Sequence, residues 1–167
     1  AKVDYATGSY PYTVTAADFD KDGDMDLAVA NNGSTSVSVF LNTGNGTFAT
    51  KVDYTTGSSP HIVTTADFDK DGDIDMAVAN FGSNNVSVLM NNGNGTFAAK
   101  VDYTTGSYPN SVTAADFDKD GDIDMAVANQ SSNSVSVFLN NGNGTFAAKV
   151  DYTTGTDPSS VTAADLD

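Results

Sequence analysis

The sequence lacks cysteine, tryptophan, glutamate and arginine, and its 167 residues include only one histidine. Without cysteine the chain can form neither disulfides nor a thiolate metal site. The same absences leave no Ser-His-Asp or Cys-His set and no zinc triad. No pair of carboxylates is left for glycoside chemistry either, once the repeated acidic loops described below are set aside. We therefore expect that the protein is not an enzyme.

Positive charge is scarce as well, because only seven lysines accompany 22 aspartates, for a formal net charge of −15. Nucleic acids and anionic membrane surfaces are bound through basic surfaces, so we expect neither as a partner. No apolar run approaches the roughly 18 residues that a membrane-spanning helix needs. We therefore expect no insertion into a membrane.

The aspartates are concentrated in one repeated loop. The stretch Asp18-Phe19-Asp20-Lys21-Asp22-Gly23-Asp24-Met25-Asp26 holds five carboxylates in nine residues, and it recurs at 67–75 and 116–124. Carboxylates this close repel one another unless a cation lies among them, and Ca²⁺ prefers all-oxygen ligands. Gly23 can supply the positive φ that such a loop needs. We predict about three structural Ca²⁺ ions. The candidate ligand residues are Asp18, Asp20, Asp22, Asp24, Asp26, Asp67, Asp69, Asp71, Asp73, Asp75, Asp116, Asp118, Asp120, Asp122 and Asp124.

Two other interpretations of the loop are less favoured. A solvated acidic turn does not account for three copies with the same Asp-x-Asp-x-Asp-Gly-x-x-Asp spacing. An EF-hand needs a glutamate at the twelfth position of its loop, where this chain has Val29, Val78 and Val127. Apolar β-type residues follow each loop, so we expect it to join two strands.

The whole chain repeats with a period of 49 residues. Periods of about 40 to 50 residues with β-type composition are typical of propeller blades. We predict an all-β fold of tandem four-stranded β-propeller blades, about 3.5 repeats, within a longer propeller or superhelical array. Residues 1–17 would hold the last strand of a preceding blade and the first strand of blade 1. Repeats then cover 18–66, 67–115 and 116–164, and 165–167 begin a truncated fourth.

Within one repeat, short apolar runs predict strands at 14–18, 26–30, 37–41 and 47–54, separated by Gly- and Asn-rich turns. The terminal segments 2–5 and 161–165 add a fourth and a first strand, which makes 14 in all. The second strand is apolar on both faces, as expected for a sheet packed between two others. Phe48, Phe97 and Phe146, which open the fourth strands, are predicted to pack between blades.

The motif Ala-Asp-Phe-Asp-x-Asp-Gly-Asp-x-Asp, followed by an apolar strand, resembles the FG-GAP/VCBS repeats of integrin-alpha-type β-propellers along the whole chain. The resemblance implies four-stranded blades with calcium in the turn between the first and second strands. It implies as ligands the side chains of Asp18, Asp20, Asp22 and Asp26 and the carbonyl of Asp24, and likewise in the other loops. The family's Gly-Ala-Pro is replaced here, for example by Ser9-Tyr10-Pro11, so the resemblance does not extend to integrin-like ligand recognition.

Six asparagines begin Asn-x-Ser/Thr sequons and are glycosylation acceptors by pattern. They are Asn32, Asn45, Asn85, Asn94, Asn129 and Asn143. Asn-Gly before a strand is also what a tight hairpin turn requires, so a repeated fold would repeat the sequon without any glycan. The sequence leaves both interpretations open.

Calcium is millimolar outside cells, which favours an extracellular or cell-surface location. The favoured function is a calcium-stabilised module for structural assembly or adhesion, whose partners are further copies of itself or further blades. Repeated head-to-tail contacts that do not close a ring would form a filament. The alternative is a glycan-binding lectin-type propeller that uses aromatic residues in turns that vary between repeats, including Tyr10, Tyr12, Phe81 and Tyr108.

Overall fold

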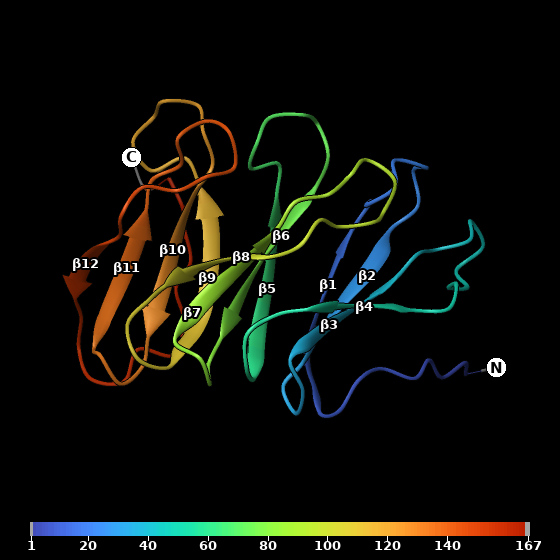
Figure 1. Cartoon of the computed structure of the whole chain (residues 1–167), viewed down its shortest axis with the longest axis horizontal. Helices are drawn as coiled ribbons and strands as arrows, with labels where there is room; N and C mark the ends of the chain where they lie inside the picture. The colour runs from blue at the N-terminus through green and yellow to red at the C-terminus, as the bar shows by residue number, and fades with distance from the viewer. Residues whose placement is uncertain (1, 166–167) are drawn as a thin grey trace.

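The protein is built from β-strands throughout the part of the chain that the structure describes. The computed structural model describes residues 2–165, in which twelve strands form three four-stranded antiparallel sheets. The sheets follow one another along the long axis of the molecule (Figure 1). Within these residues no helix could cross a lipid bilayer. The predicted all-β fold of tandem four-stranded blades is confirmed, as an open row of three blades.

Each blade is a meander in which every strand pairs with the one before it. Blade 1 comprises β1 (Pro11–Ala17), β2 (Asp26–Asn31), β3 (Ser36–Phe40) and β4 (Val52–Thr55). Blade 2 comprises β5 (Pro60–Ala66), β6 (Asp75–Asn80), β7 (Asn85–Leu89) and β8 (Val101–Thr104). Blade 3 comprises β9 (Pro109–Ala115), β10 (Asp124–Asn129), β11 (Ser134–Phe138) and β12 (Val150–Thr153). The sheets recur with the 49-residue period. A repeat counted from Asp18 begins between the first and second strands of a blade, so each such repeat spans parts of two blades.

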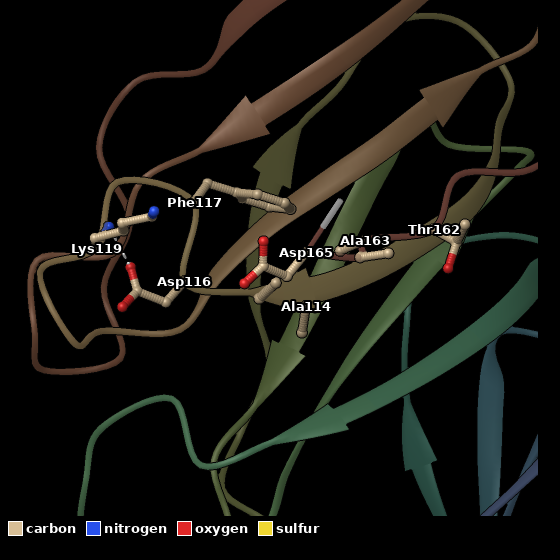
Figure 2. A pocket seen from close by; sticks show the side chains of 9 residues that line it. Ala114, Asp116, Phe117, Lys119, Thr162, Ala163 and Asp165 are labelled. Carbon is tan, nitrogen blue, oxygen red and sulfur yellow. Dashed lines mark hydrogen bonds between the residues drawn. The ribbon is translucent and has the colours of Figure 1, made fainter. Parts of the chain in front are cut away.

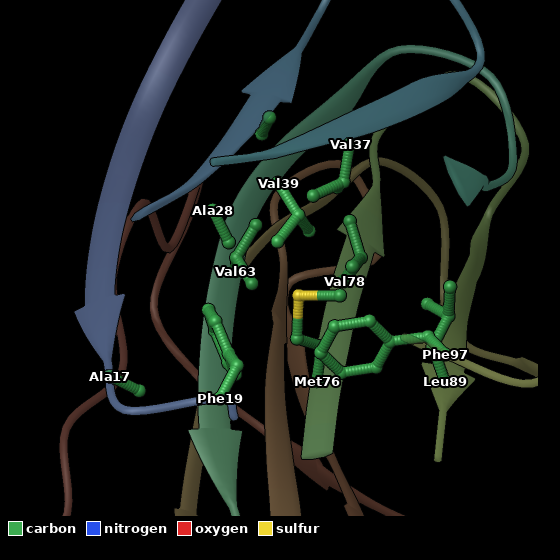
Figure 3. Packing of buried hydrophobic residues seen from close by; sticks show 11 residues of the cluster. Ala17, Phe19, Ala28, Val37, Val39, Val63, Met76, Val78, Leu89 and Phe97 are labelled. Carbon is green, nitrogen blue, oxygen red and sulfur yellow. The ribbon is translucent and has the colours of Figure 1, made fainter. Parts of the chain in front are cut away.

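The hydrophobic core lies between the blades. One cluster joins blades 1 and 2 (Figure 3), and an equivalent cluster joins blades 2 and 3. The second strand of blade 2 serves both, because Met76 and Val78 belong to the first cluster while Ala77 and Ala79 belong to the second. The small alanine face lets the neighbouring sheet approach closely. The prediction that the second strand is apolar on both faces is therefore confirmed.

Two of the three repeated phenylalanines, Phe97 and Phe146, pack between blades, as predicted. The ring of Phe97 in blade 2 lies edge-on to Phe19 and Tyr54 of blade 1, with centroids 5.3 and 5.2 Å apart. Phe146 packs in the same way on Phe68, with centroids 5.5 Å apart. Their counterpart Phe48 packs on Tyr5, at 5.4 Å, and Tyr5 belongs to no sheet in the described residues. Aromatic edges thus fill the same position at both boundaries between the described blades.

The predicted fourth strands and terminal strands are wrong in part. The fourth strands begin at Val52, Val101 and Val150, and the phenylalanines before them form only isolated bridges to asparagines of the preceding turn. Left-handed glycines, such as Gly44 and Gly46 in blade 1, turn the chain there. Segments 2–5 and 161–165 are not strands, because the described residues contain no further sheet to pair with them. Twelve strands are therefore described instead of 14, and 166–167 lie outside the described residues.

Candidate metal centres

The three acidic loops lie at equivalent places in the three blades. Loop 1 (18–26), loop 2 (67–75) and loop 3 (116–124) each connect the first strand of a blade to its second. The antiparallel register fixes their ends, because Ala17 pairs with Asp26, Ala66 with Asp75 and Ala115 with Asp124. Each loop is therefore a hairpin connection held by a buried strand pair, as the sequence predicted.

Within each loop the structure brings carboxylate oxygens together. One oxygen from each of three aspartates lies within 4.8 Å of the others, and every loop has such a group. The groups are Asp18, Asp20 and Asp22; Asp67, Asp69 and Asp71; and Asp116, Asp118 and Asp124. Each is a set of oxygen donors of the kind that a hard cation takes. The described chain thus has three places that could hold a metal ion.

Hydrogen bonds from the backbone wrap loop 1 around its own carboxylates. The N–H of Gly23 donates to Asp18 Oδ2 at 3.0 Å, and that of Asp24 donates to Asp22 Oδ1 at 2.8 Å. Gly23 has a φ of +93°, as predicted. Lys21 also has a positive φ, of 60°, which the sequence analysis missed. Loops 2 and 3 repeat both features, so the acidic residues themselves shape the turn.

Two carboxylate oxygens are buried without a partner. Asp18 Oδ1 and Asp67 Oδ1 are shielded from solvent and accept no hydrogen bond from the described residues. A buried acceptor without a partner costs free energy comparable to a lost hydrogen bond, and more when it carries charge. A cation among these oxygens would remove that cost. The residues present therefore fit a bound metal ion.

The last aspartate of each loop has a structural role as well as its predicted role as a ligand. Asp26 is fully buried, and its two oxygens accept the backbone N–H groups of Phe19 and Asn42, both at 2.7 Å. Asp75 and Asp124 have the same pair of bonds. Only Asp124 has an oxygen within its loop's metal-ligand group. These three residues join the loop to the turn after the third strand.

The fourth aspartate of loops 2 and 3 contacts the preceding blade. Lys21 of loop 1 forms an ion pair with Asp73 of loop 2, and Lys70 of loop 2 forms one with Asp122. Each side-chain hydrogen bond raises the pKa of the lysine, and the other carboxylates of the receiving loop raise it further. Asp24, Asp73 and Asp122 were predicted to offer a metal ion their backbone carbonyls, and in loops 2 and 3 the side chain is bound by lysine.

The loop carboxylates are costly to ionise together. Burial, followed by the charge of neighbouring aspartates, raises the pKa of Asp20, Asp69 and Asp118. Burial raises the pKa of Asp75 to about 6, even though the N–H groups of Asn91 and Phe68 favour its charged form. Buried, mutually repelling carboxylates of this kind gain most from a cation.

The variable turn residues meet in an aromatic stack on the side of the sheets away from the loops. The stack consists of Tyr12, His61, Phe81 and Tyr108, whose successive ring centroids lie 4.3, 4.4 and 4.7 Å apart. His61 Nδ1 also lies 2.8 Å from Asn110 Oδ1. Both faces of His61 and Phe81 are therefore covered by other rings. Residue-by-residue comparison of the repeats could not show that these positions touch.

Four of the six sequon asparagines fall into two kinds, and the other two, Asn32 and Asn85, are half-buried. Asn45 is exposed, and its Oδ1 accepts hydrogen bonds from the N–H and hydroxyl of Thr47, as do Asn94 and Asn143 from their threonines. These asparagines shape the turn that the sequon occupies. Asn129 is fully buried, and its Nδ2 donates to Ser134 and Ser136. A glycan cannot be accommodated there in the folded protein, so at Asn129 the structure favours the interpretation in which the sequon serves the fold.

A pocket lies on the open face of blade 3 (Figure 2). Its lining includes Ala114, Phe117 and Ala163, and Lys119 and Asp116 of loop 3 lie at its edge. The counterparts of Phe117 in the other blades, Phe19 and Phe68, are buried under the next blade, whereas Phe117 is 40% exposed. The pocket is therefore a blade face that has no neighbouring sheet within the described residues.

Comparison with known proteins agrees with this architecture. The family model for the FG-GAP-like repeat matches residues 18–78, 67–127 and 116–167. No curated protein matches the sequence.

Three solved structures have a similar fold. An Agrocybe aegerita lectin that recognises non-reducing terminal N-acetylglucosamine is 22% identical, with a TM-score of 0.62, over 86% of this chain and 38% of the lectin. The Photorhabdus luminescens Tc holotoxin pore is 23% identical, with a TM-score of 0.52, over 86% and 7% of the two chains. BBS1N in complex with ARL6DN is 11% identical, with a TM-score of 0.61, over 93% of this chain and 46% of that structure's chain. The chain spans less than half the length of each, and the likeness concerns the fold alone.

Proposed function

Because the chain belongs to the FG-GAP-like repeat family, we propose that it is a non-enzymatic module of β-propeller blades, stabilised by one calcium ion in each complete loop. The ions would lie among the carboxylate groups of loops 1, 2 and 3. Oxygen-only donors favour Ca²⁺ over the softer metals, which take nitrogen or sulfur. The observation that carries the proposal is the pair of buried, unpartnered oxygens, Asp18 Oδ1 and Asp67 Oδ1.

Calcium binding can be tested by counting ions and by measuring stability. In equilibrium dialysis the chain is expected to bind three Ca²⁺, and Asp18→Asn is expected to bind two. Asp4→Asn, which removes an exposed carboxylate outside the loops, should still bind three. A ligand present at about 100 times its Kd stabilises the fold by about 2.7 kcal/mol, so a chelator should lower the melting temperature by many degrees. Unchanged melting with excess chelator would contradict the proposal.

We place the module outside the cell or on its surface, where calcium is abundant, and assign it to assembly or adhesion. Its partner on the open face of blade 3 would be a further blade, from a longer chain or from a second copy. The exposure of Phe117 supports this, because the equivalent rings are buried by the next blade. In light scattering of the calcium-loaded protein, Phe117→Ser is expected to reduce association. A wild-type protein that stays monomeric at every concentration would count against self-assembly.

Glycan binding is the second candidate, and the fold of the Agrocybe aegerita lectin is the observation that favours it. Against it, the ring faces of Phe81 that a sugar would stack on are covered by His61 and Tyr108. A glycan array with calcium present separates the two functions. Saccharide binding that is lost in Phe81→Ala or Tyr108→Ala would place the lectin function first.

A further inference from the structure

One buried asparagine joins loop 1 to loop 2. Asn91 follows β7 in blade 2, and its Nδ2 donates to the carbonyl of Phe19 at 2.8 Å and to that of Ile74 at 3.0 Å. Phe19 lies between Asp18 and Asp20 of loop 1, whereas Ile74 lies between Asp73 and Asp75 of loop 2. A single side-chain amide therefore holds the backbone of two candidate metal loops in different blades.

The same connection recurs one period later. Asn140 Nδ2 donates to the carbonyl of Phe68 in loop 2 at 2.8 Å and to that of Ile123 in loop 3 at 2.9 Å. The backbone N–H of each asparagine also donates to the last aspartate of its own loop, Asp75 or Asp124, at 2.8 Å. The repetition shows that the contact belongs to the blade boundary and not to one local sequence.

These bonds form one continuous relay through the described blades. It runs from Phe19 through Asn91 to Asp75, then through Phe68 and Asn140 to Asp124. All six residues are at most 6% exposed. Buried hydrogen-bond networks whose members are all paired are rigid, and they strengthen in the low dielectric of the interior. The position of one loop therefore constrains the position of the next.

We propose that Asn91 and Asn140 couple the metal loops, so that calcium binding to one loop raises the calcium affinity of its neighbour. The inference rests on the proposed calcium function. An ion that orders loop 2 fixes Asp75 and hence Asn91, which in turn orders Phe19 between two ligands of loop 1. The second ion then has a smaller ordering cost, which is positive cooperativity. Charge alone acts in the opposite direction, because filling one site removes negative charge that attracts the next cation.

The chain contains a matched control for this coupling. Asn42 is the counterpart of Asn91 in blade 1, and its backbone N–H donates to Asp26 in the same way. Its Nδ2 donates to Met25 of its own loop, at 3.1 Å, and contacts no second loop within residues 2–165. Asn42→Ala and Asn91→Ala therefore remove the same chemical group, but only Asn91→Ala removes a link between loops.

Calcium titration of the full chain by isothermal calorimetry tests the coupling separately from binding itself. The wild type and Asn42→Ala are expected to bind three ions with a binding curve steeper than that of independent sites. Asn91→Ala is expected to bind three ions with a shallower curve, and loop 1 should lose affinity by roughly 5-fold or more, the lower end of typical allosteric couplings. Three ions bound independently in the wild type, or an equal effect of Asn42→Ala, would overturn the coupling and leave the calcium function intact.

A second variant decides the question if Asn91→Ala does not fold. Asp69→Asn weakens loop 2 without touching the relay, and hydrogen exchange by mass spectrometry can follow loops 1 and 3 separately as calcium is added. Coupling predicts that both loops need roughly 5-fold more calcium for protection than in the wild type. Unchanged midpoints in loops 1 and 3 would refute the coupling. Loss of calcium binding in every variant and in the wild type would instead refute the proposed function, and the coupling with it.

Discussion

In calcium-free buffer the protein should become more stable as the pH falls from about 7.5 towards 5, because its carboxylates are poorly tolerated in the charged form. Asp75 shows this most clearly, since burial raises its pKa from an ordinary 3.8 to about 6. A group whose folded-state pKa is raised binds its proton more tightly in the folded state than in the unfolded one. Its charged form therefore destabilises the fold above the folded pKa, and protonation removes that penalty.

The size of the effect follows from the pKa difference. A shift of about two units corresponds to about 3 kcal/mol, developed between about pH 6.5 and pH 4. Asp20, Asp69 and Asp118 shift in the same direction and add to it. With calcium bound the sign should reverse, because protons compete with the ion for the same oxygens.

Urea unfolding followed by circular dichroism, at several pH values with and without calcium, measures how the free energy of unfolding depends on pH in each condition. Asp75→Asn, which cannot titrate at this position, should remove about 3 kcal/mol of the calcium-free stability gained between about pH 6.5 and pH 4. Asp4→Asn, at an exposed residue, should leave that gain unchanged. The reasoning is refuted if the calcium-free wild type loses stability between about pH 7 and 5, or if calcium leaves the sign unchanged.

Two further substitutions test the blade boundaries. Phe97→Ala removes a ring that is 7% exposed between blades 1 and 2, and it should cost about 3–5 kcal/mol in urea unfolding. The half-buried Phe48→Ala is the control, and an equal cost would show that the boundary is not the reason. Lys21→Met removes the lysine paired with the buried Asp73 and should lower the melting temperature of the calcium-free protein. Lys119→Met should lower it less, because Lys119 has no ion pair in residues 2–165.

Much of the fold could be predicted because one short repeat carries both the turn chemistry and the strand pattern. The loop from Asp18 to Asp26 fixes where β1 ends and β2 begins, and period-two apolar residues mark β3. The fourth strand was predicted to begin at 47 because Phe48 looks like a strand residue. Its ring packs on Tyr5, however, and its backbone has only one bridge, to Asn42. A pattern of apolar residues indicates which side chains are buried, but it does not show which backbone groups form hydrogen bonds.

In the candidate site too, some contacts could be predicted from the sequence and others could not. Contacts within one loop, such as Gly23 to Asp18, could be predicted from spacing because they join residues close in sequence. Contacts between loops, such as Asn91 to Phe19, join residues 72 positions apart and depend on how two sheets pack. The sequence does mark Asn42, Asn91 and Asn140 as a repeated position. A turn asparagine is so common, however, that repetition alone does not indicate a link between blades.

The aromatic stack has a consequence for folding. Tandem repeats that are nearly identical are prone to misassembly, because any sheet could dock in the place of any other. The stack is formed by residues at positions where the repeats differ, so each blade has its own side chains to offer to its neighbours there. If blade 3 docked next to blade 1, Asn110 would face Tyr12 in place of His61, and the Tyr12–His61 ring pair that crosses this boundary would be lost. Each such pair is worth about 0.5–1.5 kcal/mol. The differences between the repeats at these positions thus favour the correct order of the blades.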